Sequence, residues 1–195
     1  MNHTLNRCRQ IVEAQTARLT SQVRGLAGDA SGVSAVEFAL LLPVMVTLYL
    51  GTVEISQGIA ADRKVSLSAR TAADLVSQVS SINNTDMTNV LNATGTVMSP
   101  FSASNLKVTV TSVKIDANGN ATVDWSDTLN GTAYSKGAAV TLPTALKVAN
   151  SYLIWSEVSF SYKPTIGYLI SGTLSLKDQI YMRPRLSDSV ARTTS

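Results

Sequence analysis

The chain has 195 residues, of which 45% are hydrophobic and 15% are charged, whereas about a quarter of the residues are charged in an average soluble protein. Its net charge of +3 is concentrated in residues 1–32, which hold four arginines and two carboxylates, and no basic stripe with interleaved aromatic residues follows, so we exclude nucleic-acid binding. The only cysteine, Cys8, and the only histidine, His3, exclude intramolecular disulfides, cysteine-based metal sites and Ser-His or Cys-His catalysis. We expect no cofactor.

The first predicted element is a basic leader, residues 1–32. Apolar side chains recur in it at a rough helical spacing, with arginines beside them. Two interpretations stay open: an amphipathic helix on an anionic membrane surface, or a partly ordered tail. The apolar positions are Leu5, Cys8, Val12, Leu19, Val23 and Leu26.

A membrane span follows the leader. An uncharged apolar run extends from Phe38 to Val53, and adding Val33–Val36 makes it long enough to cross a hydrocarbon core of about 30 Å as a helix. The extension brings Glu37 to the membrane boundary, and a carboxylate there is a functional hint by default. The arginines of the leader predict that residues 1–32 lie in the cytoplasm and that the C-terminal bulk lies outside the membrane.

The junction between leader and span resembles the cleavage site of type IV prepilins, because Gly32 ends the leader and Glu37 stands at the fifth position after it. The resemblance implies that a membrane-embedded aspartyl peptidase cuts between Gly32 and Val33. A glycine at the cut lets the backbone extend without side-chain clash. The released amine at Val33 would be a cation at a helix N-terminus in a poor dielectric, and the resemblance implies that Glu37 of the same or a neighbouring chain neutralises it.

Two other interpretations of this junction stay open. The first is an uncleaved signal anchor that tolerates a glutamate near the interface. The second is an ordinary secretory signal, cut at the small-x-small site of Gly58–Ala60 that follows the apolar run.

The stretch Gly32–Ala61 resembles the TadE-like family of tight-adherence (Flp-type) pilus assembly proteins. The resemblance rests on AVEFAL at Ala35–Leu40, on the Leu-Pro pair that ends at Pro43, and on GTVE at Gly51–Glu54. It implies a pseudopilin or minor pilin in the bacterial inner membrane, with one membrane span, a cytoplasmic N-terminus and a periplasmic C-terminus, or a subunit of an extracellular pilus. The implied partners are prepilin peptidase, other pilin or pseudopilin subunits, the inner-membrane assembly platform and membrane lipid.

Two features qualify the resemblance. Glu54 is a second candidate for an assembly charge, although a carboxylate that snorkels to the outer membrane boundary is the simpler interpretation. Larger TadG-type relatives carry a metal motif Asp-x-Ser-x-Ser in an adhesion domain, and the nearest string here, Asp29–Val33, lacks the second serine. The TadE-like family is therefore favoured.

Beyond the span, the sequence predicts an α+β fold, in which a long N-terminal transmembrane and stem helix precedes a small antiparallel-sheet periplasmic domain. A stem helix over 55–79 has a narrow seam of small residues, and a loop with one helical turn at 87–91 follows it. Four strands are expected, with an Asn-Gly hairpin turn at 116–120 rather than a calcium loop, and with a long excursion over 130–150. The expected strands are 106–115, 121–129, 152–163 and 173–182; the seam is Val65, Ala69, Ala72, Val76 and Val79; the expected domains are the leader 1–32, the transmembrane helix 33–57, the stem 58–82 and the β-rich domain 83–195.

The functional hypothesis is a cleaved pilin-like subunit that takes part in pilus assembly. Its competitor is an uncleaved, single-pass anchored binding domain in the periplasm. An enzyme would need a carboxylate pair such as Asp124 and Asp127, whose odd spacing on a strand places them on different faces, so none is expected. Four aromatic residues are expected to fill the core or an inter-subunit face, with an aromatic ligand groove as the alternative: Trp155, Phe160, Tyr162 and Tyr168.

Overall fold

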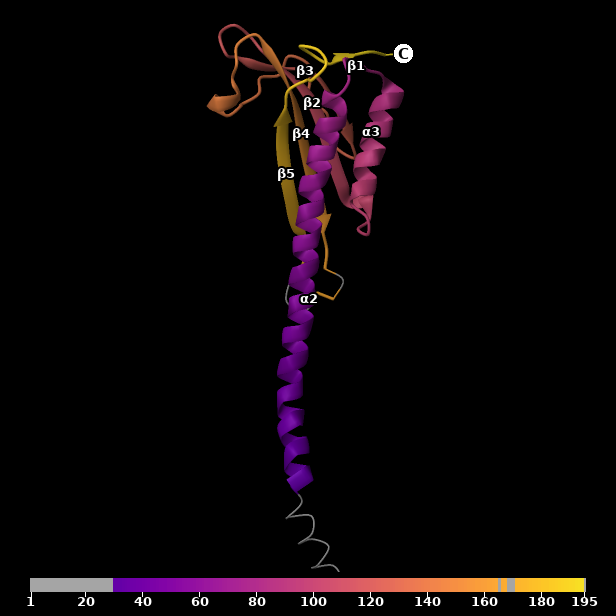
Figure 1. Cartoon of the computed structure of the whole chain (residues 1–195), viewed down its shortest axis with the longest axis vertical. Helices are drawn as coiled ribbons and strands as arrows, with labels where there is room; N and C mark the ends of the chain where they lie inside the picture. The colour runs from indigo at the N-terminus through magenta and orange to yellow at the C-terminus, as the bar shows by residue number, and fades with distance from the viewer. Residues whose placement is uncertain (1–29, 165, 168–170, 195) are drawn as a thin grey trace, which may run out of the picture. The chain divides into compact units, whose positions relative to one another are not determined.

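The computed structural model describes residues 30–164, 166–167 and 171–194. The chain forms two compact units, residues 1–50 and residues 51–195, and helix α2 (Ala30–Ser77) has residues in both (Figure 1). The leader up to residue 29 and Tyr168 lie outside the described residues. The expected α+β class is confirmed: one long apolar helix precedes a small antiparallel sheet.

The second unit is built on a four-stranded antiparallel sheet with the order β3-β2-β4-β5. The strand predictions are confirmed to within one residue at each end. The turn at Asp116 is also confirmed, since its Oδ1 accepts hydrogen bonds from the amides of Asn118 and Asn120, both at 2.8 Å, and Gly119 adopts a φ of 80°. The strands are β2 (Leu106–Ile115), β3 (Ala121–Leu129), β4 (Ser151–Tyr162) and β5 (Leu174–Met182).

Within this unit, one face of the sheet is covered by the C-terminal half of α2 and by helix α3 (Asn84–Val97), which lie side by side in Figure 1. The predicted seam is confirmed, because Val65, Ala69, Ala72 and Val76 are fully buried. Small side chains let the helix backbone approach the sheet closely. The sheet contributes alternate residues of β2 and β4 to the same core: Leu106, Val108, Val110, Ile154, Val158, Phe160 and Tyr162.

Helix α3 is longer than the single turn that the sequence predicts. Asn83 caps it, since its side chain accepts a hydrogen bond from the amide of Asp86 at 2.8 Å. Met87, Leu91 and Thr94 recur on one face and are buried. The Asn- and Thr-rich composition hid the helix, because its stability comes from this buried face rather than from helix propensity.

The opposite face of the sheet carries a smaller cluster at one end, formed with the excursion over 130–150. Leu142 packs there with residues of three strands, and the excursion hydrogen-bonds to the edge of β3 through the amide of Val123 and the carbonyl of Ala138, at 2.9 Å. A bridge between Thr122 and Ala139 continues this contact. The excursion therefore covers the first residues of an otherwise open strand edge.

The C-terminal segment returns to the domain core, which the sequence does not predict. Strand β6 (Ala191–Arg192) pairs in parallel with β1 (Ser81–Ile82), and the Trp125 indole donates a hydrogen bond to the carbonyl of Val190 at 2.7 Å. The Arg192 guanidinium binds both carboxylate oxygens of Asp127, at 2.8 and 3.1 Å, and this contact raises the pKa of Arg192. The last residues thus fasten the α2–α3 connection to the sheet.

Replacing Arg192 by Met should lower the free energy of unfolding by about 2 kcal/mol, because Asp127 loses a partly buried bidentate partner. Urea unfolding of the full chain in detergent, followed by tryptophan fluorescence, measures the change. Arg183→Met is the matched control, since Arg183 is exposed and makes no hydrogen bond or ion pair within the described part of the chain; it should stay within about 0.5 kcal/mol. Equal losses of unfolding free energy in both variants would contradict the stabilising role of the Arg192–Asp127 ion pair.

Candidate processing and assembly segment

The predicted cleavage site lies on the first described turns of α2. Gly32 and Val33 are both exposed, and a Cβ added at Gly32 would meet no atom within 4 Å. The Gly32–Val33 bond is helical, so cleavage in a narrow active site requires this turn to unwind. Glycine makes that unwinding easier, since it is less favourable in a helix than alanine by about 1 kcal/mol.

Glu37 lies one helical turn beyond Val33 on the same face of α2, because residues four apart on a helix are neighbours. Its side chain is exposed, as is the side chain of Val33. The backbone nitrogen of Val33, once released as an amine, would lie about 6 Å along the helix axis from Glu37. The helix therefore places the two groups where an ion pair within one chain is sterically possible.

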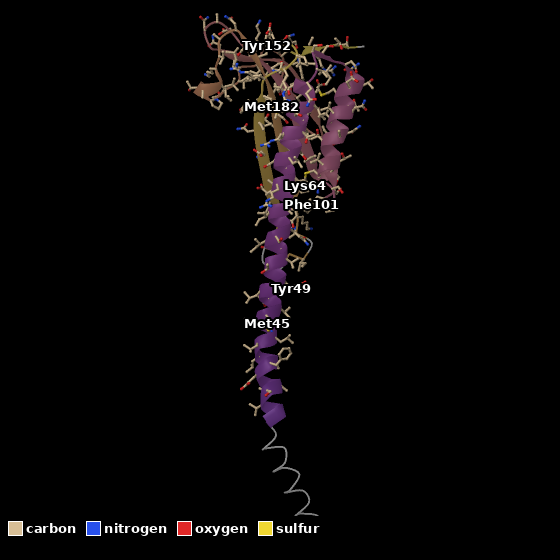
Figure 2. The ribbon with its side chains drawn as sticks, in the orientation of Figure 1. Met45, Tyr49, Lys64, Phe101, Tyr152 and Met182 are labelled. Carbon is tan, nitrogen blue, oxygen red and sulfur yellow. The ribbon has the colours of Figure 1, made fainter. Side chains whose placement is uncertain are left out.

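The segment that follows is apolar all round. Among the described residues, one helix is long and apolar enough to cross a membrane, and none of its most apolar stretch is buried in the protein. Met45 and Tyr49 project from this part of α2 in Figure 2. The helix continues through Pro43, whose carbonyl accepts a hydrogen bond from the Thr47 hydroxyl at 2.8 Å. A stretch whose apolar side chains are exposed on every face fits a membrane anchor.

Glu54 differs from the interpretation of a snorkelling carboxylate, because its side chain is only 1% exposed within the second unit. Burial and, to a smaller extent, the charge of Glu54 raise the pKa of Tyr162, which is itself buried. Tyr162 also approaches Gly58, where an added Cβ would lie 3.9 Å from its ring. Glu54 is thus part of the packing between α2 and the end of β4.

The alternative secretory site at Gly58–Ala60 lies in the interior of α2, and the next residue, Ala61, is fully buried in the core. The carboxylates of the hypothetical enzyme are also accounted for. Asp124 pairs with Lys136 at 3.5 Å, and Asp127 pairs with Arg192, so the two acids have separate partners. In the described part of the chain, no group of three or more His, Cys, Asp or Glu side chains could hold a metal ion.

Comparison with known proteins adds one finding. Residues 32–74 match the TadE-like protein family. The resemblance seen in the sequence is therefore confirmed, and the matched part begins at Gly32 and ends inside α2. No curated protein and no solved structure matches the chain.

The structure contains a stack of three aromatic rings that the sequence does not predict. On the sheet face away from the helices, Trp155 stacks on Tyr134, with ring centroids 5.3 Å apart, and on Tyr181, at 5.9 Å. The sequence predicts Trp155 in the core or at an inter-subunit face, with an aromatic ligand groove as the alternative. It does not predict the stack, because Tyr134 lies in the excursion, where no periodic pattern indicates its position. Phe160 and Tyr162 do lie in the core, as predicted.

Replacing Tyr162 by Phe should leave the free energy of unfolding unchanged or raise it by about 1 kcal/mol, because the hydroxyl is buried without a hydrogen-bond partner among the described residues. Tyr162→Ala should cost about 3–5 kcal/mol, since the ring packs on Phe101 and Phe160. Urea denaturation of the full chain in detergent gives both values. A loss above about 1 kcal/mol for Tyr162→Phe would instead assign the hydroxyl a bonding role beside Glu54.

Proposed function

We propose that the chain is a pilin-like subunit, a pseudopilin or minor pilin, of a tight-adherence pilus or secretion system, cut by prepilin peptidase after Gly32. The observation that carries the proposal is the family match over residues 32–74, which begins at the proposed cleavage position. The exposed apolar helix and the one-turn spacing of Val33 and Glu37 support it. The proposed role is structural rather than enzymatic.

The proposed topology follows from charge and hydropathy. Residues 1–32 lie in the cytoplasm, 33–57 contain the segment that crosses the bacterial inner membrane, 58–82 form a stem, and 83–195 form the periplasmic domain. The four arginines of the leader support this orientation. The proposed partners are prepilin peptidase, other pilin or pseudopilin subunits and the inner-membrane assembly platform, with membrane lipid around the span.

Cleavage is tested by mass spectrometry of the protein from its native membrane. We expect a mature chain that begins at Val33, and we expect Gly32→Leu to accumulate the precursor, because a branched side chain would obstruct the extended backbone at the cut. The matched control is Gly28→Leu, which changes a leader glycine away from the proposed bond and should be processed normally.

The same experiment separates the competing function, an uncleaved anchored domain. That hypothesis requires Met1 and the leader to persist in wild-type membranes with prepilin peptidase present, and it requires Gly32→Leu to change nothing. Either result would overturn the proposed processing.

Glu37 has a different proposed role from the cleavage site. A carboxylate near the membrane boundary costs free energy. The released amine of Val33 adds a further cost unless an anion neutralises it. Because the amine exists only after cleavage, the pair would form only in the mature chain. The carboxylate would then favour insertion of the mature subunit, or of a neighbour, into the assembly.

Glu37→Leu should leave membrane insertion intact but reduce pilus production severalfold, because the Val33 amine loses its counter-ion. Membrane fractionation and immunoblotting of sheared pili measure the two effects separately. Glu37→Asp is the control, since it keeps the charge and should retain most of the assembly. A normal amount of pili from the Glu37→Leu variant would contradict the proposed charge pair.

A further inference from the structure

The outer sheet face, which points away from α2 and α3, carries ordered rows of polar and aromatic residues that the proposed function does not use. Antiparallel register aligns neighbouring strands residue by residue, and alternate residues share a face. Three adjacent rows run across β2, β4 and β5: Lys107–Ser159–Lys177, then Thr109–Glu157–Gln179, then Thr111–Trp155–Tyr181.

The first two of these rows form the floor of a hollow of about 660 Å³, closed on one side by the excursion after β3. The excursion contributes Asn130, Thr132 and Tyr134 to its wall. A hollow of this volume accommodates a small ligand or a short oligomer, since ligand sites in proteins commonly measure about 300–1,000 Å³.

An aromatic ring forms part of that wall. One face of Tyr134 stacks on Trp155 at an interplanar angle of 18°, and Tyr134 remains 41% exposed. The rest of the ring is therefore available to a ligand. Because Trp155 is buried beneath it, the ring is held in place and loses little freedom when a ligand stacks on it.

Two polar groups of the middle row are also fixed in orientation. The Trp155 indole donates a hydrogen bond to Oε1 of Gln179 at 3.2 Å, and the Gln179 amide nitrogen has no acceptor among the residues that the structure describes. Burial raises the pKa of Glu157, and the interaction of its carboxylate with the Tyr134 hydroxyl opposes the rise. A carboxylate has more acceptor sites than one hydroxyl uses, so Glu157 can accept from a ligand as well.

The first row supplies positive charge. Lys107 and Lys177 are exposed, and neither has an ion-pair partner within the described ranges. They stand two strands apart, about 9.5 Å between backbones, with the small side chain of Ser159 between them. Two flexible ammonium groups over a serine can close on one anionic group from both sides.

From this arrangement we propose that the outer face of the sheet binds an acidic saccharide, a sugar ring that bears a carboxylate. The ring lies on Tyr134, its hydroxyls bond Glu157 and the Gln179 amide, and its carboxylate lies between Lys107 and Lys177. Alternating donors and acceptors beside an aromatic platform match a sugar, which presents an apolar ring face and polar hydroxyls at its rim.

An acidic peptide strand fits this place less well. Extended peptides bind by adding to a free sheet edge, and their side chains enter pockets at alternate positions. The hollow instead lies over β2, β4 and β5, and the backbone groups of β2 and β4 are paired on both sides. A ligand there therefore cannot add a strand to β2 or β4 and meets their side chains.

The test uses the full chain in phosphatidylcholine nanodiscs and isothermal titration calorimetry, with tetragalacturonate as the probe. We expect saturable binding that is at least about tenfold tighter than binding of neutral maltotetraose. Lys107→Gln with Lys177→Gln should weaken it about tenfold or more, and so should Tyr134→Ala. The control pair Lys114→Gln with Lys147→Gln removes the same charge from exposed lysines outside the hollow and should leave the affinity unchanged.

Three outcomes would overturn the proposal. The first is an absence of binding in a protein whose melting curve is normal. The second is equal affinity for the acidic and neutral sugars. The third is binding of inorganic polyphosphate as tight as that of tetragalacturonate and unaffected by Tyr134→Ala, which would indicate attraction of any polyanion. None of these outcomes bears on cleavage after Gly32, so this proposal and the proposed function fail separately.

Discussion

The contact between the small-residue seam of α2 and the four-stranded sheet is the interaction on which the rest of the second unit depends. Val65, Ala69, Ala72 and Val76 are fully buried and recur after three or four residues, so they form a narrow stripe at the centre of the contact. Alanine at the centre of this stripe adds little bulk between the helix and the sheet, on which Ser112 and Ser156 are buried as well. Larger side chains on either surface would separate the layers and leave voids.

The sequence of α2 changes character along its length, and the change has a physical reason. Before residue 50 the large apolar side chains are exposed on every face. From Ala61 onward burial is restricted to the seam and to small residues beside it, such as Ser68 and Ala73, while Arg63 and Arg70 are exposed. The first pattern suits a helix surrounded by lipid, because apolar side chains are favourable there on every face. The second suits a helix with water on one side and a sheet on the other. Glu54 lies between the two patterns. Its burial in the second unit shows that the folded domain already covers part of the helix at residue 54, before the first seam residue, Val65.

Most of the fold could be predicted from the sequence because strict periodicity reports burial directly. The strands β2 and β3, the turn at Asp116 and the seam of α2 all follow from alternation, a turn signal or helical spacing. Helix α3 was underestimated because its Asn- and Thr-rich sequence has low helix propensity and its buried face has only a few members. The return of Arg192 to Asp127 spans a sequence separation of 65 residues, and nothing local encodes such a pairing. The same limit hid Tyr134, which approaches Trp155 only after the sheet and the excursion have formed. Gly32 and Glu37 could be singled out because the residue types that a prepilin cleavage site and a membrane span would require fall within one short stretch.

The two faces of the sheet are under unequal constraints, and this bears on what the chain can do beyond anchoring. The helix-covered face must be apolar for the domain to fold. The outer face needs apolar residues only at the end where Leu142 and Trp155 form the smaller cluster. Lys107, Glu157 and Lys177 therefore contribute little to the core, and partial burial of the Glu157 carboxylate carries an electrostatic cost, which the raised pKa records. Residues that the fold does not require, held in register beside a stacked aromatic pair, are better explained by recognition than by stability.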